Sequence, residues 1–119
     1  WQLIAAQCGA KVIAAPVLDD GALALDSWRA LLNDRTRFIA VVHVSNTLGT
    51  VNPVEVIIAE ARQRDIPVLV DGAQAVAHLP VDFAALGADF YTLSAHKLYG
   101  PTGIGALWAK SEDMVGERF

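Results

Sequence analysis

The sequence has little of several features that mark particular protein classes. Its 119 residues hold one cysteine, Cys8, so no disulfide can form within the chain. No apolar run reaches the roughly 18 residues of a membrane-spanning helix. The first residues, from Trp1, also lack the basic start of a secretory signal. We therefore expect a soluble, cytoplasmic protein.

Charged residues are sparse as well. Nine basic and thirteen acidic side chains give a formal net charge of −4, with no run of like charges and no basic stripe interleaved with aromatic residues. This pattern argues against nucleic acid as a partner. The three histidines and the single cysteine show no metal-ligand spacing, so no metal site is predicted.

Apolar side chains are abundant instead. Hydrophobic residues make up 54% of the chain, enough for a substantial core. We find no internal repeat or linker, so residues 1–119 belong to one domain. The chain starts with Trp1 rather than Met, and the polar stretch that ends at Phe119 resembles the opening of another element. We therefore expect an internal piece of a longer protein.

Helix and strand signals alternate along the chain, which predicts an α/β layered fold with a largely parallel sheet. The unbroken apolar run of residues 38–44 predicts a strand buried on both faces. Apolar runs predict the other strands at residues 11–17, 67–70, 89–93 and 106–109. Helices are predicted before Gly9, after a cap at Asp26, after a cap at Asn52, and at residues 83–86 before Gly87.

The clearest helix signal begins at Asn52. Asn52 is a typical N-cap, Pro53 suits the first helical position, and Glu55 suits the third. The residues that then share one helical face are Val54, Ile57, Ile58 and Ala61.

Polar side chains directly follow three of the predicted strands. The three segments are His43-Val44-Ser45-Asn46, Asp71-Gly72-Ala73-Gln74 and Ser94-Ala95-His96-Lys97. In open α/β sheets, ligands bind beyond the carboxyl ends of the strands. The sequence therefore predicts one ligand site built from these three segments.

The side chains at these strand ends suit one cofactor. The amine of Lys97 can form a Schiff base, and the Asp71 carboxylate can keep a pyridine nitrogen protonated. Ser94 and His96 can donate hydrogen bonds to a phosphate, while Gln74 can reach a ring hydroxyl. Together these groups predict pyridoxal 5'-phosphate (PLP).

Residues 44–49, 70–74 and 94–105 resemble a known family in order and spacing. They are similar to the core of the class V aminotransferase family, and most closely to the SufS/CsdA-type cysteine desulfurases. The resemblance implies a homodimeric fold-type-I PLP enzyme that converts L-cysteine to L-alanine. The sulfur would remain as an enzyme persulfide, to be passed to a sulfur-acceptor protein for iron–sulfur cluster or sulfur-cofactor assembly.

The resemblance also implies an incomplete domain. Residues 1–119 would be a three-layer α/β part of the PLP-binding large domain, without its N-terminal segment and C-terminal small domain, and inactive alone. The family's sulfur-accepting cysteine does not match Cys8, which we expect to be a buried, inert thiol.

Carried over position by position, the resemblance implies a role for six residues. Lys97 and Asp71 would be catalytic. Lys97 would bond the cofactor covalently, Asp71 would pair with its pyridine nitrogen, Gln74 would bond its ring oxygen, Ser94 and His96 would hold its phosphate, and Asn46 would lie on the side of the substrate carboxylate.

Other interpretations of these residues remain open. Ser94 and Gln74 could satisfy backbone groups of the loops, and Asn46 could cap or turn the chain. His43 and His78 lie outside the matched positions, and we expect them to be structural or exposed. The glycines of residues 100–105 precede no helix, so they predict a tight backbone after the lysine and not a dinucleotide site.

Other activities are also open. The same motifs would serve a selenocysteine lyase, a kynureninase-like hydrolase or an amino-acid epimerase of class V, because substrate choice depends on other segments. A catalytically silent α/β domain is a hypothesis of a different class. The spacing of Ser94 and Lys97 also fits serine acyltransferases, but their partner motifs are absent from the sequence.

Overall fold

The structure is a computed structural model that describes residues 1–110. These residues divide into two compact units, of which the first is residues 1–35 and the second begins at Thr36. The polar stretch that ends at Phe119 lies outside the described residues. No helix within residues 1–110 is both long and apolar enough to cross a membrane.

The first unit contains two short helices. Helix α1 (Gln2–Cys8) ends as predicted at Gly9, whose φ of 68° is a left-handed conformation that glycine adopts without strain. Helix α2 (Leu25–Leu31) buries Trp28. The prediction of a buried thiol is wrong, because Cys8 is exposed at the end of α1.

Two other expectations for the first unit are wrong. Residues 11–17 form no strand and contribute only an isolated antiparallel bridge between Val17 and Leu23. An apolar, β-branched run forms a strand only where a partner strand takes up its backbone hydrogen bonds. Asp26 lies inside the first turn of α2 and pairs with Arg29 at 2.7 Å, so it does not cap the helix.

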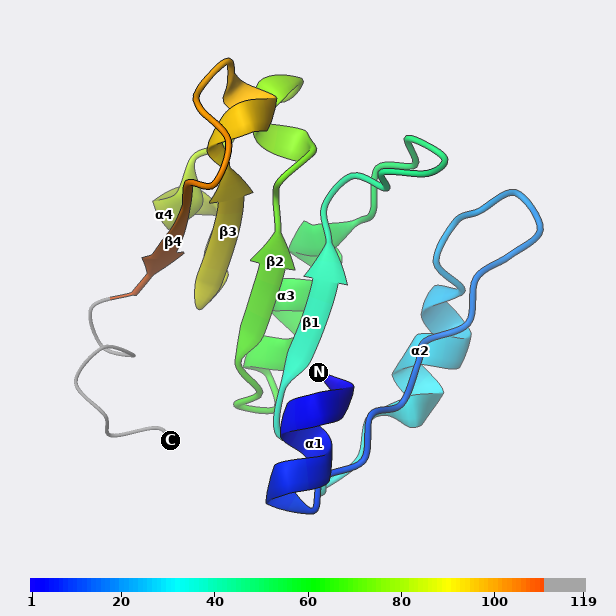
Figure 1. The fold of residues 1–119 in the computed structure, drawn as a ribbon. Coiled ribbons are helices and arrows are strands. Elements are labelled where there is room, and N and C mark those ends of the chain that lie inside the picture. The colour runs from blue at the N-terminus through cyan, green and yellow to red at the C-terminus, as the bar shows by residue number, and fades with distance from the viewer. Residues whose placement is uncertain (111–119) are drawn as a thin grey trace. The chain divides into compact units, whose positions relative to one another are not determined.

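The second unit is built on a four-stranded sheet in the order β1-β2-β3-β4 (Figure 1). The first three strands are mutually parallel and β4 is antiparallel to β3, which confirms the α/β class and the largely parallel sheet. The third layer of the expected three-layer fold stays a prediction. The strand bounds are Ile39–Val42 for β1, Val68–Asp71 for β2, Phe90–Ser94 for β3 and Gly105–Ala109 for β4.

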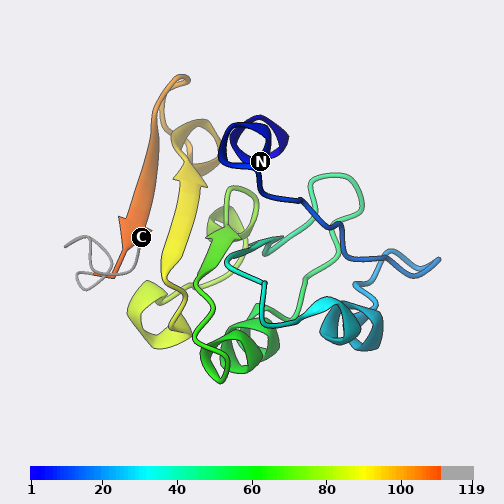
Figure 2. The same cartoon turned by 90° about the horizontal axis from the view of Figure 1, so that it is seen from below.

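Helices α3 (Val54–Arg62) and α4 (Phe83–Leu86) lie on the same face of this sheet (Figure 2). Helix α4 has the predicted bounds, with an N-cap at Asp82 and a left-handed Gly87 after its last turn. The four predicted apolar positions of α3 are all buried and pack toward the sheet. They form the core with Val68, Val70 and Tyr91.

Helix α3 begins differently from the prediction. Its N-cap is Pro53, and Asn52 makes no cap. The side-chain amide of Asn52 instead donates to the carbonyl of Val42 at 2.8 Å, and its backbone N–H donates to the carbonyl of His43 at 2.8 Å. The long-range bonds to the end of β1 take the place of the local cap.

The prediction that residues 38–44 are buried on both faces is also wrong. In β1, Ile39 is buried, but Ala40 and Val42 on the other face are exposed. Burial alternates because α3 and α4 both cover the face on which Ile39 lies.

The amino ends of β2 and β3 are joined by a buried carboxylate. Asp89, only 7% exposed, accepts a hydrogen bond from the backbone N–H of Val68 at 2.7 Å. Its other oxygen lies 3.1 Å from the ammonium group of Lys110. This pair fixes β2 against β3 at the end of the sheet opposite the polar strand ends.

We expect Asp89→Asn to destabilise the second unit by about 2 kcal/mol, because a hydrogen bond to a charged acceptor is replaced by a neutral one in a buried place. The measurement is the urea midpoint of the full-length protein, together with amide hydrogen exchange at Val68. The exposed carboxylate of Asp82 provides the control, since Asp82→Asn keeps an N-cap side chain and should change the midpoint by a few tenths of a kcal/mol. Unchanged exchange at Val68 in Asp89→Asn would contradict the assignment.

Candidate functional site

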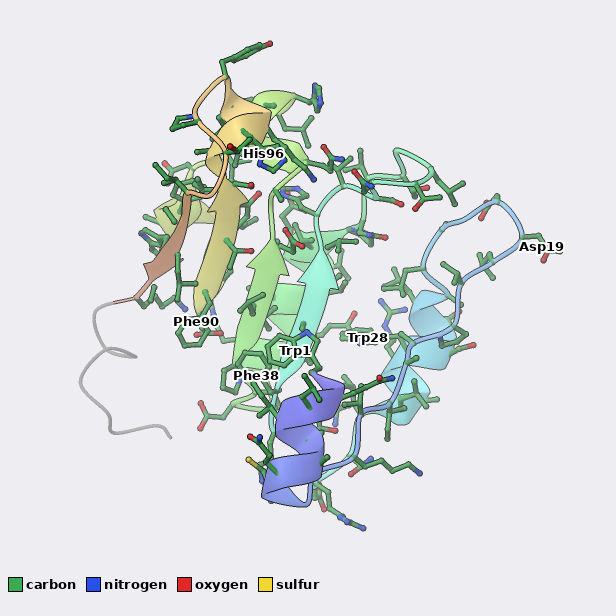
Figure 3. The ribbon with its side chains drawn as sticks, viewed as in Figure 1. Trp1, Asp19, Trp28, Phe38, Phe90 and His96 are labelled. Atoms are coloured by element: carbon green, nitrogen blue, oxygen red, sulfur yellow. The ribbon has the colours of Figure 1, made fainter. Side chains whose placement is uncertain are left out.

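The three predicted polar segments lie at the same end of the sheet, beyond the carboxyl ends of β1, β2 and β3. Figure 3 shows His96 at this end, whereas Phe38 and Phe90 lie at the amino ends of their strands. Two short 3₁₀ helices follow the strands, η1 (Ala75–Ala77) after β2 and η2 (Ala95–Leu98) after β3, and they contact each other. The parallel pairing of the strands therefore gathers the segments, as expected.

Asp71 is the last residue of β2 and is half-buried. One carboxylate oxygen, Oδ1, accepts a hydrogen bond from the backbone N–H of Ala73 at 3.0 Å, which orients the side chain within the turn. Within residues 1–110, Oδ2 accepts no further hydrogen bond. A fixed carboxylate with one open oxygen can pair with a protonated ring nitrogen.

Gln74 and Asn46 come from different strand ends and contact each other. The side-chain amide of Gln74 donates a hydrogen bond to the side-chain oxygen of Asn46. This contact joins the segment after β2 to the segment after β1. Because each amide keeps other donor and acceptor atoms, the pair can still bind a polar ligand group.

Ser94 and His96 form a second pair. The Ser94 hydroxyl and Nδ1 of His96 are hydrogen-bonded at 2.9 Å, and His96 is exposed. One of the two groups donates to the other, according to the imidazole tautomer, and the remaining O–H or N–H at the start of η2 can donate to an anionic group.

Lys97 lies in η2 and is half-buried. Its ammonium group makes neither a hydrogen bond nor an ion pair with any other residue between 1 and 110. The structure therefore brings Lys97 to the same end of the sheet as Asp71 without joining the two side chains. A half-buried amine without a protein partner is available to a ligand.

The backbone after Lys97 is tight, as the glycine-rich sequence predicts. The N–H of Gly100 donates to the carbonyl of Ala95 at 2.9 Å, and the N–H of Ala95 donates to the carbonyl of Ile104 at 3.0 Å. A side-chain carbon at Gly105 would lie 2.8 Å from the carbonyl oxygen of Leu93. These contacts hold the segment that carries Lys97 close to β3 and β4.

Sequence reasoning missed one buried pair beneath the site. Tyr91 in β3 is fully buried, and its hydroxyl is hydrogen-bonded at 2.9 Å to Nδ1 of His43, the residue directly after β1. His43 is thus buried and structural, which was one of the two alternatives for it. A tyrosine inside an apolar strand was the available signal, because a buried phenol requires a hydrogen-bond partner.

Burial keeps both members of this pair neutral near pH 7. It lowers the pKa of His43 below its usual value, although the nearby Glu55 carboxylate acts in the opposite direction. Burial and, to a smaller extent, the negative charge of Asp71 raise the pKa of Tyr91 to about 12. The phenol therefore keeps its proton and lies within the electrostatic reach of Asp71.

The site thus offers an available amine, an oriented carboxylate, an amide pair and a hydroxyl–imidazole pair. These groups can bond an aldehyde, a ring nitrogen, a ring oxygen and a phosphate. No group of three or more histidine, cysteine, aspartate or glutamate side chains within residues 1–110 could hold a metal ion.

Comparisons with known proteins agree in both sequence and structure. Residues 1–116 match the family model "Aminotransferase class-V". Over 112 residues the chain is 56% identical to the cysteine desulfurase of Cronobacter sakazakii. The aligned residues make up 94% of this chain and 28% of that protein. Over 114 residues it is 50% identical to a probable cysteine desulfurase of Xylella fastidiosa, covering 96% of this chain and 27% of that protein.

Solved structures show the same likeness. The cysteine desulfurase CsdA from Escherichia coli matches with a TM-score of 0.89 and 41% identity, over 94% of this chain and 28% of that one. A cysteine desulfurase from Thermococcus onnurineus matches with a TM-score of 0.86 and 35% identity, again over 94% and 28%. The chain therefore spans about a quarter of the length of the relatives that it matches.

Proposed function

This chain belongs to the aminotransferase class-V family, and we propose on that basis that the full-length protein is a PLP-dependent cysteine desulfurase. The reaction would convert L-cysteine to L-alanine and leave the sulfur as an enzyme-bound persulfide. Residues 1–119 would form an incomplete part of the PLP-binding large domain, inactive alone.

One observation carries the proposal. The amine of Lys97 has no partner within residues 1–110, and it lies at the same end of a largely parallel sheet as Asp71, whose Oδ2 is also open. Most lysines and aspartates at a surface are exposed, whereas these two are half-buried. An available amine and an oriented carboxylate are the two groups that PLP requires from a protein.

The residues fit the cofactor group by group. Lys97 would hold PLP covalently through its amine, and Asp71 would pair with the ring nitrogen. Gln74 would donate to the ring oxygen. The Ser94 and His96 pair would hold the phosphate, with the hydrogen bonds that phosphate oxygens accept.

The remaining side chains would act on the substrate. Asn46, linked to Gln74, would lie on the side of the substrate carboxylate. When bound, PLP supplies a conjugated ring that accepts electrons from the substrate α-carbon. Asp71 would sustain that property by keeping the ring nitrogen protonated, because its negative charge stabilises the positive one.

The proposal extends to the biological setting. We infer a cytoplasmic homodimer that transfers the persulfide sulfur to an acceptor protein, for iron–sulfur cluster or sulfur-cofactor assembly. The cysteine that accepts sulfur from the substrate would belong to another part of the full-length protein, since Cys8 does not match it. The similarity to cysteine desulfurases over more than nine tenths of the chain supports this setting.

The cofactor is tested first by absorbance. We expect the full-length protein mixed with PLP to show a visible band that borohydride removes, with the mass of reduced cofactor on the peptide that contains Lys97. Alanine and sulfide release from L-cysteine, in the presence of a thiol reductant, then tests the substrate.

The outcomes separate the alternatives. If the band forms on Lys97 but the protein turns over another amino acid, such as selenocysteine or kynurenine, the protein has a different class V activity. Absence of the band, or label on Lys11 or Lys110, would reject the PLP proposal and leave the catalytically silent domain.

A further inference from the structure

Tyr91 reaches across the middle of the sheet. It belongs to β3, whereas its hydrogen-bond partner His43 follows β1, and β2 lies between these two strands. The phenol therefore crosses β2 to reach the imidazole. Both side chains are buried on the face that carries α3 and α4, and the ring of Phe83 in α4 lies 4.9 Å from the Tyr91 ring.

The crossing occurs at Gly72, the residue directly after Asp71. A side-chain carbon at Gly72 would overlap the outer ring atoms and the hydroxyl of Tyr91. Gly72 is buried, so the phenol fills the space that its missing side chain leaves. The hydroxyl end of Tyr91 thus packs directly against the backbone that carries Asp71.

Backbone hydrogen bonds fix the same short segment from both neighbouring strands. The N–H of His43 donates to the carbonyl of Asp71 at 2.8 Å, and the N–H of Gly72 donates to the carbonyl of Thr92 at 2.9 Å. Together with the phenol, these contacts leave the backbone of Asp71 and Gly72 little freedom. The direction of the Asp71 carboxylate depends on that backbone.

We propose that Tyr91 and His43 are positioning residues for Asp71: their hydrogen bond across Gly72 holds the carboxylate in the orientation that binds the PLP ring nitrogen. The inference rests on the proposed function. Neither side chain touches the ligand, because both lie beneath Gly72 on the helical face. They act on the site by fixing the backbone of Asp71 and Gly72, which sets where the negative charge of Asp71 lies.

Removal of the phenol hydroxyl tests the inference in the full-length protein. We expect Tyr91→Phe to bind PLP about five- to tenfold more weakly, the effect of one lost hydrogen bond. We also expect the ring nitrogen of the bound cofactor to lose its proton at a lower pH, because a looser carboxylate stabilises its positive charge less well. Equilibrium dialysis with PLP and a spectral pH titration measure the two quantities.

A pair of variants at His43 separates the hydrogen bond from simple packing. The side-chain amide of His43→Gln can still bond the phenol, whereas His43→Leu cannot. We expect His43→Gln to retain most of the PLP affinity and the titration midpoint, and His43→Leu to match Tyr91→Phe. This pair also decides the question if Tyr91→Phe does not fold.

Asp89→Asn is the control for lost stability, since it weakens the sheet at the opposite end. We expect its PLP affinity and titration midpoint to equal those of the wild type. If wild-type protein loads PLP on Lys97 but Tyr91→Phe and His43→Leu keep its affinity and midpoint, the positioning role is wrong and the proposed function stands. If wild-type protein does not load PLP, both proposals fail.

Discussion

Replacing Lys97 with arginine should reduce the proposed cysteine desulfurase activity of the full-length protein by on the order of 10³-fold or more, the scale of effect seen when a covalent catalyst is removed. Arginine keeps the positive charge, but its delocalised guanidinium does not form the covalent bond that the lysine amine forms. The measurements are alanine release from L-cysteine at saturating PLP and the visible absorbance band, which should disappear.

The matched control is Lys11→Arg, the same exchange at an exposed position of the first unit. It should leave both activity and absorbance unchanged. If Lys97→Arg retained more than about a tenth of the activity, the covalent role of Lys97 would be contradicted, because charge alone would then account for its contribution.

Gly72→Ala should lower the stability of the second unit by about 1–3 kcal/mol, the usual effect of adding a methyl group to a filled core. The added carbon would overlap the ring of Tyr91 and displace the phenol from His43. Urea unfolding of the full-length protein measures the loss. We expect weaker PLP binding as well, because Asp71 precedes the displaced residue.

A double variant identifies the clash as the cause. Combined with Tyr91→Leu, Gly72→Ala should cost less than it does alone, since the ring that it strikes is gone. Gly49→Ala is the comparison for backbone effects. Gly49 has a φ of 72° and open space around it, so the stability lost in Gly49→Ala reflects backbone conformation only. Strict additivity of Gly72→Ala and Tyr91→Leu would contradict the overlap.

Helices were predicted best where a few neighbouring residues decide the structure. The buried face of α3 follows from apolar residues at helical spacing, and the end of α4 follows from the terminating Gly87. The strand ends were also predictable, because apolar runs stop abruptly at Asp71 and near Ser94. With parallel pairing, these ends had to meet at one edge.

Predictions failed where a distant partner decides the structure. Residues 11–17 have the composition of a strand but form only one bridge, and Asn52 bonds the end of β1 instead of capping α3. A strand or a cap competes with every other bond that the folded chain offers to the same group. That competition involves residues far apart in the sequence.

The sequence by itself determined the chemistry of this protein: which side chains follow the strands, and hence the predicted PLP site around Lys97 and Asp71. Only the tertiary structure decided what lies beneath that site. Tyr91 and His43 are 48 residues apart, and they meet because three strands pair in register around Gly72. Local patterns encode helices and strand ends, whereas a contact across a central strand depends on the register of all three strands at once.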